Sequence, residues 1–495
     1  MSRLPFVPSD ILRAALEEER VLFHTPEGAL RYRDVAHTAA RFANALRALG
    51  AQPGDRIAVQ VDKSCTAACL YFGVLQAGLV FVPFNTAYTA RELAPMLEDA
   101  EPFLLICDPS RRDTLTPLAP RVLTLDAHGE GSLAELARAA SDEWPHDAPS
   151  DDAIAAIVFT SGTTGRSKGA TLTHGNLRFS ADALARAWRM SERDVLLHAL
   201  PIFHVHGLFI AMNTLLRVGG SMYFLDKFNE DAWFSALPRC TVMMGVPTHY
   251  VRLLADARLT REATAHMRLF VSGSAPLLGE TFHAFAARTG HTLLERYGMT
   301  ETSVIASNPY DGARVAGTVG MALPGTELRI GGEGKVGVVQ VRGPHVFHGY
   351  WRREEQTRRE HTDDGFFITG DLGQLDAEGR LTLIGRAKDL IITGGLNVYP
   401  KEIELLIDAE PEVVESAVVG IAHPDFGEAV TAFVVFTGSN EGDREAALLA
   451  KLTPLLAAFK RPKRVVALHE LPRNTMGKVQ KNELRAQYTN LYTNE

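Results

Sequence analysis

Residues 153–176 read AIAAIVFTSGTTGRSKGATLTHGN, an apolar run followed by a loop rich in glycine, serine and threonine. The apolar run over 153–160 predicts a buried strand. Gly162 and Gly165 would let the backbone turn its N–H groups toward an anion, and Lys168 adds a positive charge. A Walker A loop is excluded, because other residues separate Gly165 from Lys168. The stretch therefore predicts a strand followed by a polyphosphate-binding loop, with a plain flexible connection as the alternative.

Helix and strand signals alternate on both sides of this stretch. Apolar residues recur at helical spacing over 35–49, and the segments 56–61 and 103–107 read as strands. The apolar segment 65–84 is interrupted by polar and glycine residues, so it predicts a buried helix, a turn at Gly78 and a buried strand rather than a membrane span. This alternation predicts an α/β fold with largely parallel sheets.

The character of the sequence changes after residue 385. The elements expected beyond it are a helix over 401–407, strands over 413–421 and 429–436, and a helix over 445–458. We therefore expect a large N-terminal domain over 1–385 and a smaller α+β C-terminal domain over 386–495. The acidic, alanine-rich segment 126–152 is expected to be a surface connection.

Composition restricts the partners of this chain of 495 residues, whose net charge is −8. The acidic balance argues against nucleic-acid binding and against an anionic membrane surface, which leaves small molecules. The N-terminus carries no signal core, so we expect a cytoplasmic protein. Four scattered cysteines are expected to be core thiols and not a disulfide framework or zinc site: Cys65, Cys69, Cys107 and Cys240.

Further motifs follow the loop in a fixed order. They are SGSAPL (272–277), ERYGMTET (295–302), GFFITGDLG (365–373), GRAKDLIITGG (385–395) and PRNTMGKVQK (472–481). Together with the loop they resemble the adenylate-forming, AMP-binding superfamily of acyl-CoA synthetases, luciferases and peptide-synthetase adenylation domains. The resemblance implies that a carboxylate attacks the α-phosphate of ATP to give an acyl-adenylate, which then reacts with CoA.

The resemblance also implies a role for each motif residue. The expected ATP-binding residues are Thr160, Ser161, Gly162, Thr163, Thr164, Gly165, Lys168, Ser272, Gly273, Ser274, Ala275, Pro276, Tyr297, Gly298, Thr300, Asp371, Arg386 and Lys478. Within this set, Thr164 and Lys168 would contact the β- and γ-phosphates, and Tyr297 would stack on adenine. Asp371 would accept hydrogen bonds from the ribose hydroxyls, with Arg386 alongside.

The chemistry is expected to depend on three residues. Thr300 would contact the α-phosphate, and Glu301 would hold Mg²⁺, which favours hard oxygen ligands. Lys478 would stabilise the charge that builds on phosphorus in the transition state. Because Lys478 is expected in the C-terminal domain, that domain must move, with a hinge at Lys388 and with CoA passing Gly394 and Gly395.

The acid is indicated by Arg296, where most of the superfamily has glycine. Its guanidinium could pair bidentately with a second carboxylate of the substrate, and the motifs look closely like those of malonyl-CoA synthetases. The alternative for Arg296 is a surface ion pair with Glu295 or Glu301. Further candidates for the acyl pocket are His204, Val205, Arg268 and Val304. Arg268 could instead simply lie at the start of a strand.

The sequence also permits other acids and other functions. The apolar SVIA stretch (303–306) replaces the polar stretch of malonate-specific relatives, so methylmalonate or another substituted malonate is an alternative acid. A ligase for a monocarboxylic acid, medium-chain or aryl, is a second hypothesis, and a nucleotide-binding protein without turnover is a third. Acylation of Lys478 by a lysine acylase, reversed by a deacylase, would remove the charge needed in the first step.

Overall fold

The computed structural model describes most of the chain. The described residues are 4–26, 28–144, 148–160, 167–332, 334–394, 396–438, 443–474 and 477–492. The chain forms two compact units: the first comprises Met1–Leu328 and Val341–Phe367, the second Arg329–Gln340 and Ile368–Glu495. Among the described residues, no helix has the length and apolar character needed to cross a membrane.

One sheet of the first unit carries the strand predicted over 153–160. Its order is β18-β8-β7-β4-β3-β5-β6, with β3 (Arg56–Gln60), β4 (Val80–Pro83), β5 (Leu104–Cys107), β6 (Val122–Thr124), β7 (Ile154–Thr160), β8 (Lys168–Thr173) and β18 (Gly349–Tyr350). The strands β7, β4, β3, β5 and β6 are parallel, whereas β8 returns antiparallel to β7 with Lys168 opposite Thr160. The predicted phosphate loop therefore connects these two strands.

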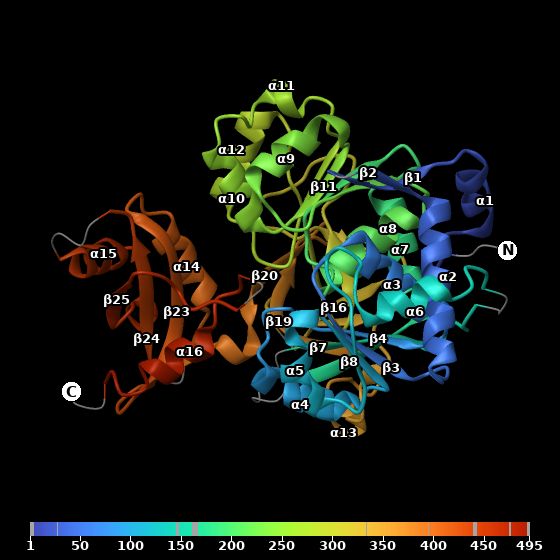
Figure 1. Cartoon of the computed structure of the whole chain (residues 1–495). Coiled ribbons are helices and arrows are strands. Elements are labelled where there is room, and N and C mark those ends of the chain that lie inside the picture. The colour runs from blue at the N-terminus through green and yellow to red at the C-terminus, as the bar shows by residue number, and fades with distance from the viewer. Residues whose placement is uncertain are drawn as a thin grey trace. The chain divides into compact units, whose positions relative to one another are not determined.

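Helices α2 (Tyr32–Ala48), α3 (Cys65–Gln76) and α6 (Ser132–Ala139) pack together beside this sheet (Figure 1). A side chain at Gly73 would meet the Ala39 carbonyl at 2.6 Å, so glycine is needed where α3 crosses α2. The segment 126–152 was expected to be a plain surface connection. It instead contains α6, which buries Leu133, because its apolar residues fall on one helical face.

The second sheet of the first unit has nine strands. Its order is β15-β14-β13-β12-β11-β9-β10-β1-β2, with β1 (Val21–Thr25), β2 (Gly28–Arg31), β9 (Val195–His198), β10 (Ser221–Phe224), β11 (Val242–Gly245), β12 (Leu269–Ser272), β13 (Leu294–Met299), β14 (Ser303–Ser307) and β15 (Met321–Ala322). The strands from β1 to β13 in this order are parallel, β2 pairs antiparallel with β1, and β14 pairs antiparallel with both β13 and β15. The carboxyl ends of β11, β12 and β13 therefore lie together.

Helices α9 (Glu230–Ala236), α10 (Pro247–Ala255), α11 (Arg261–Thr264) and α12 (Gly279–Thr289) gather beside β11 (Figure 1). Buried Trp233, Phe270 and Phe285 form the core beneath them. The remaining helical elements of this unit are α1 (Ser9–Glu17), α4 (Ala90–Ala100), η1 (Pro109–Arg111), α5 (Arg112–Leu115), η2 (Thr116–Leu118), α7 (His174–Ala187), η3 (His206–Met212), α8 (Asn213–Leu216), η4 (Leu237–Arg239) and α13 (Glu354–Arg359).

The second unit contains two sheets. A four-stranded sheet has the order β16 (Glu327–Gly331), β17 (Gly337–Arg342), β19 (Phe367–Leu375), β20 (Leu381–Arg386). A second sheet orders β22 (Leu396–Val398), β21 (Ile391–Thr393), β24 (Gly427–Phe436) and β23 (Val413–His423), and β25 (Arg464–Leu468) also pairs with β24. The helical elements are η5 (Ala387–Asp389), α14 (Pro400–Asp408), α15 (Arg444–Leu452), η6 (Ala458–Lys460) and α16 (Lys481–Gln487).

The predicted α/β class, with a large N-terminal part of parallel-rich sheets and a smaller C-terminal part, is confirmed. The compact second unit begins before the expected boundary at 385/386, because β19 and β20 belong to it. None of the four cysteines, all of them described, forms a disulfide; Cys65 is partly exposed and the other three are buried.

Candidate active site

The predicted phosphate loop is anchored at its base by an ion pair. Lys168, the first residue of β8, places its Nζ 2.7 Å from Oε1 of Glu360 and 4.8 Å from the centre of the Tyr350 ring. Its partner across the hairpin, Thr160, lies at the end of β7. Five of the predicted phosphate ligands lie outside the described residues: Ser161, Gly162, Thr163, Thr164 and Gly165.

The segment SGSAP follows β12 at the carboxyl edge of the nine-stranded sheet. Gly273 donates its N–H to the Gly245 carbonyl of β11 at 3.2 Å. Ser274 has a φ of 71°, a left-handed conformation that costs free energy outside glycine and is frequent at functional sites. Ala275 is partly buried and Pro276 is exposed. This turn therefore lies at the carboxyl end of β12, beside β11 and β13.

Arg296 on β13 is buried, with only 4% of its surface exposed. Its Nε and Nη2 atoms have no hydrogen-bond partner, and no ion pair involving it is found in the described part of the chain. The guanidinium lies against Gly273, where a Cβ atom would be 2.4 Å from Nε. Burial lowers the pKa of Arg296 to about 10. The expected alternative, an ion pair with Glu295 or Glu301, is therefore not seen.

His206 lies in the same region and is not among the residues predicted from the sequence. It begins the π-helix η3, is 2% exposed, and its Nδ1 lies 3.1 Å from the Ser274 hydroxyl. Its Nε2 has no partner among the described residues. Burial, followed by the nearby Arg296 charge, holds the pKa of His206 well below its usual value, so the ring is neutral. π-Helical turns are frequent at functional sites, but they leave no clear sequence signal.

The other predicted acyl-pocket residues differ in their surroundings. The Nδ1 of His204 accepts the backbone N–H of His206 at 3.2 Å, and Val205 is buried between them. Val304 on β14 is buried in register with Gly298 of β13. Gly298 has no room for a side chain, because a Cβ would be 1.7 Å from the Ser303 carbonyl oxygen.

Arg268 is bound elsewhere. Its Nε and Nη2 lie 2.6 Å from the two carboxylate oxygens of Asp194, and its Nη1 donates to the Trp188 carbonyl. Asp194 is 2% exposed, so removing this arginine would leave a buried carboxylate uncompensated. The geometry therefore favours the structural alternative, and we no longer place Arg268 in the acyl pocket.

Glu301 follows Thr300 in the turn after β13. Its side chain is 5% exposed, and Oε1 accepts the hydroxyl proton of Tyr350 at 3.0 Å. No group of three or more histidine, cysteine or acidic side chains that could enclose a metal occurs in the described residues. A single carboxylate suits Mg²⁺, which is commonly held by one or two carboxylates and the substrate phosphates. Glu301 therefore fits the predicted role.

The predicted nucleoside contacts lie in both units. Tyr297 of β13 is 8% exposed. In the second unit, Asp371 of β19 pairs with Arg386 of β20, with Nε and Oδ1 2.6 Å apart. The strands hold these two residues directly opposite each other. The predicted arginine and aspartate are therefore neighbours, as their joint assignment to the ribose requires.

The predicted hinge and catalytic lysines belong to the second unit. Burial lowers the pKa of Lys388, which lies in η5. Lys478 is exposed in a small turn where its backbone N–H donates to Asn474 Oδ1 at 2.9 Å and its carbonyl accepts the Asn474 N–H. Gly394 has a φ of 55°, and Gly395 lies outside the described residues.

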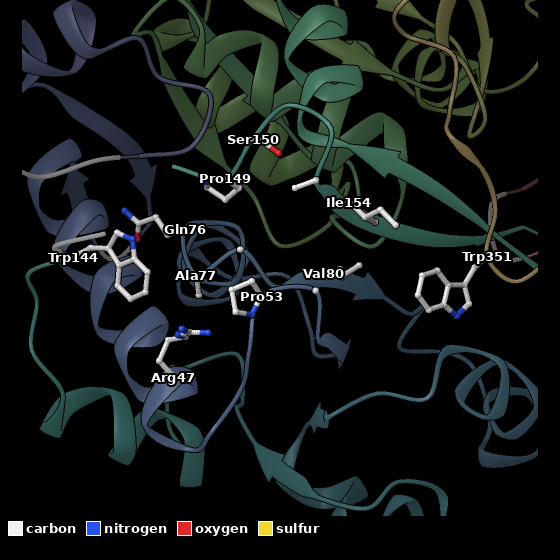
Figure 2. Close-up of a pocket in the computed structure, with 13 residues that line it drawn as sticks. Arg47, Pro53, Gln76, Ala77, Val80, Trp144, Pro149, Ser150, Ile154 and Trp351 are labelled. Carbon is white, nitrogen blue, oxygen red and sulfur yellow. The ribbon is translucent and has the colours of Figure 1, made fainter. Parts of the chain in front are cut away.

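A pocket of about 590 Å³ is lined by none of the predicted site residues (Figure 2). Its walls include Pro53, Gly78 and Ile154, which stand at or before the amino ends of β3, β4 and β7, together with Trp144 and Trp351. The predicted phosphate loop follows the carboxyl end of β7. The pocket is therefore at the opposite edge of the sheet, and we assign it no part in the site.

Comparisons with known proteins show the family to which the chain belongs. Residues 13–351 match the family described as AMP-binding enzyme, and residues 402–478 match the AMP-binding enzyme C-terminal domain. The chain is 33% identical to a malonate-CoA ligase of Arabidopsis thaliana, over 89% of this chain and 79% of that protein. It is 35% identical to a feruloyl-CoA synthase of Amycolatopsis, over 93% and 94%.

Among solved structures, the chain is similar to ATP-bound MatB from Rhodopseudomonas palustris. The two share 50% sequence identity and a TM-score of 0.93, over 97% of this chain and 99% of that one. The family match covers both the phosphate-loop strands and the Arg296 segment of the first unit, and the C-terminal match reaches Lys478. The chain therefore belongs to the AMP-binding enzymes.

Proposed function

We propose that this enzyme is a malonyl-CoA synthetase, which joins malonate or a small substituted malonate to CoA with conversion of ATP to AMP and pyrophosphate. One observation carries the choice of acid: the Arg296 guanidinium is buried beside Gly273 with Nε and Nη2 unpaired. The relatives' names alone do not decide it, since ligases for malonate and for an aryl acid are similarly distant from this chain.

The physical argument concerns the cost of a buried, unpaired cation. A desolvated charge is unfavourable by several kcal/mol until a counter-charge arrives. A second carboxylate on the substrate supplies that charge and can accept two parallel N–H bonds. A monocarboxylate would leave the guanidinium unpaired, a penalty of about 3 to 5 kcal/mol. The neutral His206 adds an unpaired ring nitrogen in the same region.

As an AMP-forming acyl-CoA synthetase, the enzyme works in two steps. In the first, a carboxylate oxygen of the acid bonds to the α-phosphorus of ATP while the bond from that phosphorus to the bridging oxygen breaks and pyrophosphate leaves. In the second, the CoA thiolate bonds to the acyl carbon and AMP leaves. Mg²⁺, when bound, neutralises phosphate charge. Lys168 and Thr300 hold phosphate oxygens, and Glu301 is the residue that would hold the metal.

The proposed division of labour extends to the C-terminal part of the chain. We propose that the segment from Arg386 onward moves about Lys388, so that Lys478 serves adenylation and another face serves the CoA step. The exposed position of Lys478 also supports its proposed acylation by a lysine acylase, which would remove its charge. We further propose a cytoplasmic location, where ATP and CoA are present.

Pyrophosphate release from a panel of acids, with and without CoA, tests the proposal. Malonate and methylmalonate should support release, and thioester should form only when CoA is added. Butyrate and ferulate should be at least ~10³-fold poorer in kcat/KM. Preference for butyrate or ferulate would replace the proposal with a monocarboxylate ligase. Absence of release with every acid would support a nucleotide-binding protein without turnover. The relative rates on malonate and methylmalonate show whether buried Val304 leaves room for a substituent.

A further inference from the structure

Glu360, which stands immediately after α13, binds the lysine of the predicted phosphate loop. Its Oε1 lies 2.7 Å from Lys168 Nζ and accepts a second hydrogen bond from Gln356 Nε2 at 3.1 Å. The side chains of Lys168 and Glu360 are 11% and 28% exposed, so solvent screens the pair only partly. No motif of the sequence analysis includes this glutamate.

Tyr350 joins Glu360 to the predicted magnesium ligand. Its hydroxyl oxygen lies 2.8 Å from Glu360 Oε2 and 3.0 Å from Glu301 Oε1. A tyrosine has one hydroxyl proton, so it donates to one of these carboxylates at a time. Burial and the two carboxylates raise the pKa of Tyr350, which therefore keeps its proton. The Tyr350 hydroxyl thus lies between two carboxylates, that of Glu301, which is predicted to hold the metal, and that of Glu360, which binds Lys168.

The backbone around this cluster is tied down by ordinary strand pairing. Tyr350 lies in β18, opposite Ala170 of β8, and the Trp351 N–H donates to the Gly169 carbonyl at 2.7 Å. Thr357 of α13 accepts the Tyr350 backbone N–H at 2.9 Å. The helix that precedes Glu360 is therefore attached, through β18, to the strand that begins with Lys168.

We propose that Glu360 is a positioning residue, which holds the Lys168 ammonium in the orientation that receives the polyphosphate of ATP. The inference rests on the proposed function in assigning Lys168 to that polyphosphate. An ammonium has three N–H donors, so one can stay on Glu360 while others reach phosphate oxygens. A lysine without this ion pair would lose side-chain conformational entropy on binding ATP. Because Glu360 already restricts the Lys168 side chain, less entropy is lost when ATP binds. Protein kinases use a lysine-glutamate pair in the same way.

The test is equilibrium binding of the Mg²⁺ complex of the non-cleavable α,β-methylene analogue of ATP, measured by calorimetry without any acid. Glu360→Gln preserves size and removes the charge. It should weaken binding about tenfold with an unchanged melting temperature. Glu355→Gln is the matched control, because Glu355 lies on the same helix and pairs only with the exposed Arg359 in the described contacts. It should bind like the wild type.

A double-mutant cycle separates positioning from a general structural effect. In a Lys168→Met background, Glu360→Gln should change binding less than twofold, because the lysine it orients is gone. Wild-type affinity in Glu360→Gln, or the same tenfold loss in both backgrounds, would overturn the inference. If the cycle behaves as expected but malonate is not activated, only the proposed acid fails. If the wild type does not bind the analogue, both ideas fail.

Discussion

Two basic side chains of the first unit meet opposite electrostatic surroundings. Arg296 is buried with no ion pair among the described residues, whereas Lys168 is held by Glu360 at 2.7 Å. The unpaired arginine becomes favourable only once an anion enters, and we propose that it selects among acids on this basis. The proposed ligand of the paired lysine, the polyphosphate of ATP, carries several negative charges. The lysine therefore attracts it without difficulty, and the ion pair with Glu360 serves to orient the ammonium. In this proposal the same charge serves specificity at Arg296 and preorganisation at Lys168.

The largest effect should come from a third basic residue, Lys478, which belongs to the second unit. Lys478→Ala should lower adenylation, measured as malonate-dependent ATP-pyrophosphate exchange, about 10³-fold, because its charge acts in the transition state. Thioester formation from supplied malonyl-adenylate and CoA should stay within about threefold of wild type. Comparable losses in both half-reactions would show that Lys478 is not specific to the first step.

Gly273→Ala sharpens the Arg296 half of the comparison. A Cβ atom at this position would be 2.4 Å from Nε, and the flexible guanidinium would give way before the backbone does. We expect kcat/KM for malonate to fall about 10²-fold, since the bidentate pair loses its geometry. Gly279→Ala is the control, because nothing lies within 4 Å of its added Cβ. Equal behaviour of the two variants would contradict the assignment.

Lys168→Met should give the converse result. Loss of a charge-assisted contact to phosphate is expected to raise the KM for ATP roughly ten- to fiftyfold, with the preference for malonate over butyrate unchanged. Steady-state kinetics with each substrate varied in turn would measure both quantities. A changed preference for malonate over butyrate in this variant would contradict the separate roles proposed for Lys168 and Arg296.

The smallest effect concerns stability and pH. His345 is 2% exposed, and burial lowers its pKa to about 4. Because the unfolded chain protonates near the ordinary value of about 6.5, this histidine favours the folded state above that pH and opposes it as pH falls toward 4. Between pH 6.5 and 4, the free energy of unfolding should therefore fall by about 1 to 3 kcal/mol less in His345→Phe than in wild type. Parallel urea-unfolding curves for the two proteins would disprove this contribution.

Local patterns were enough to predict much of this architecture. Apolar spacing located α2, α3 and β7, and the SGSAP motif located the turn after β12, because these signals lie within a few residues. The partners of individual side chains could not be predicted from such local patterns. The partner of Arg268 is 74 residues away in sequence, so only the fold shows that the arginine is structural. His206 and Glu360 were missed for the same reason, since long-range packing gives them their partners.

The central claim is that the buried Arg296 guanidinium selects the acid. The most direct measurement is the ratio of kcat/KM for malonate to that for butyrate, in wild type and Arg296→Gly. We predict a ratio of at least ~10³ in wild type and below about 10 in the variant, with the KM for ATP little changed. A ratio that stays the same when Arg296 is removed, or a wild type that prefers butyrate, would contradict the account.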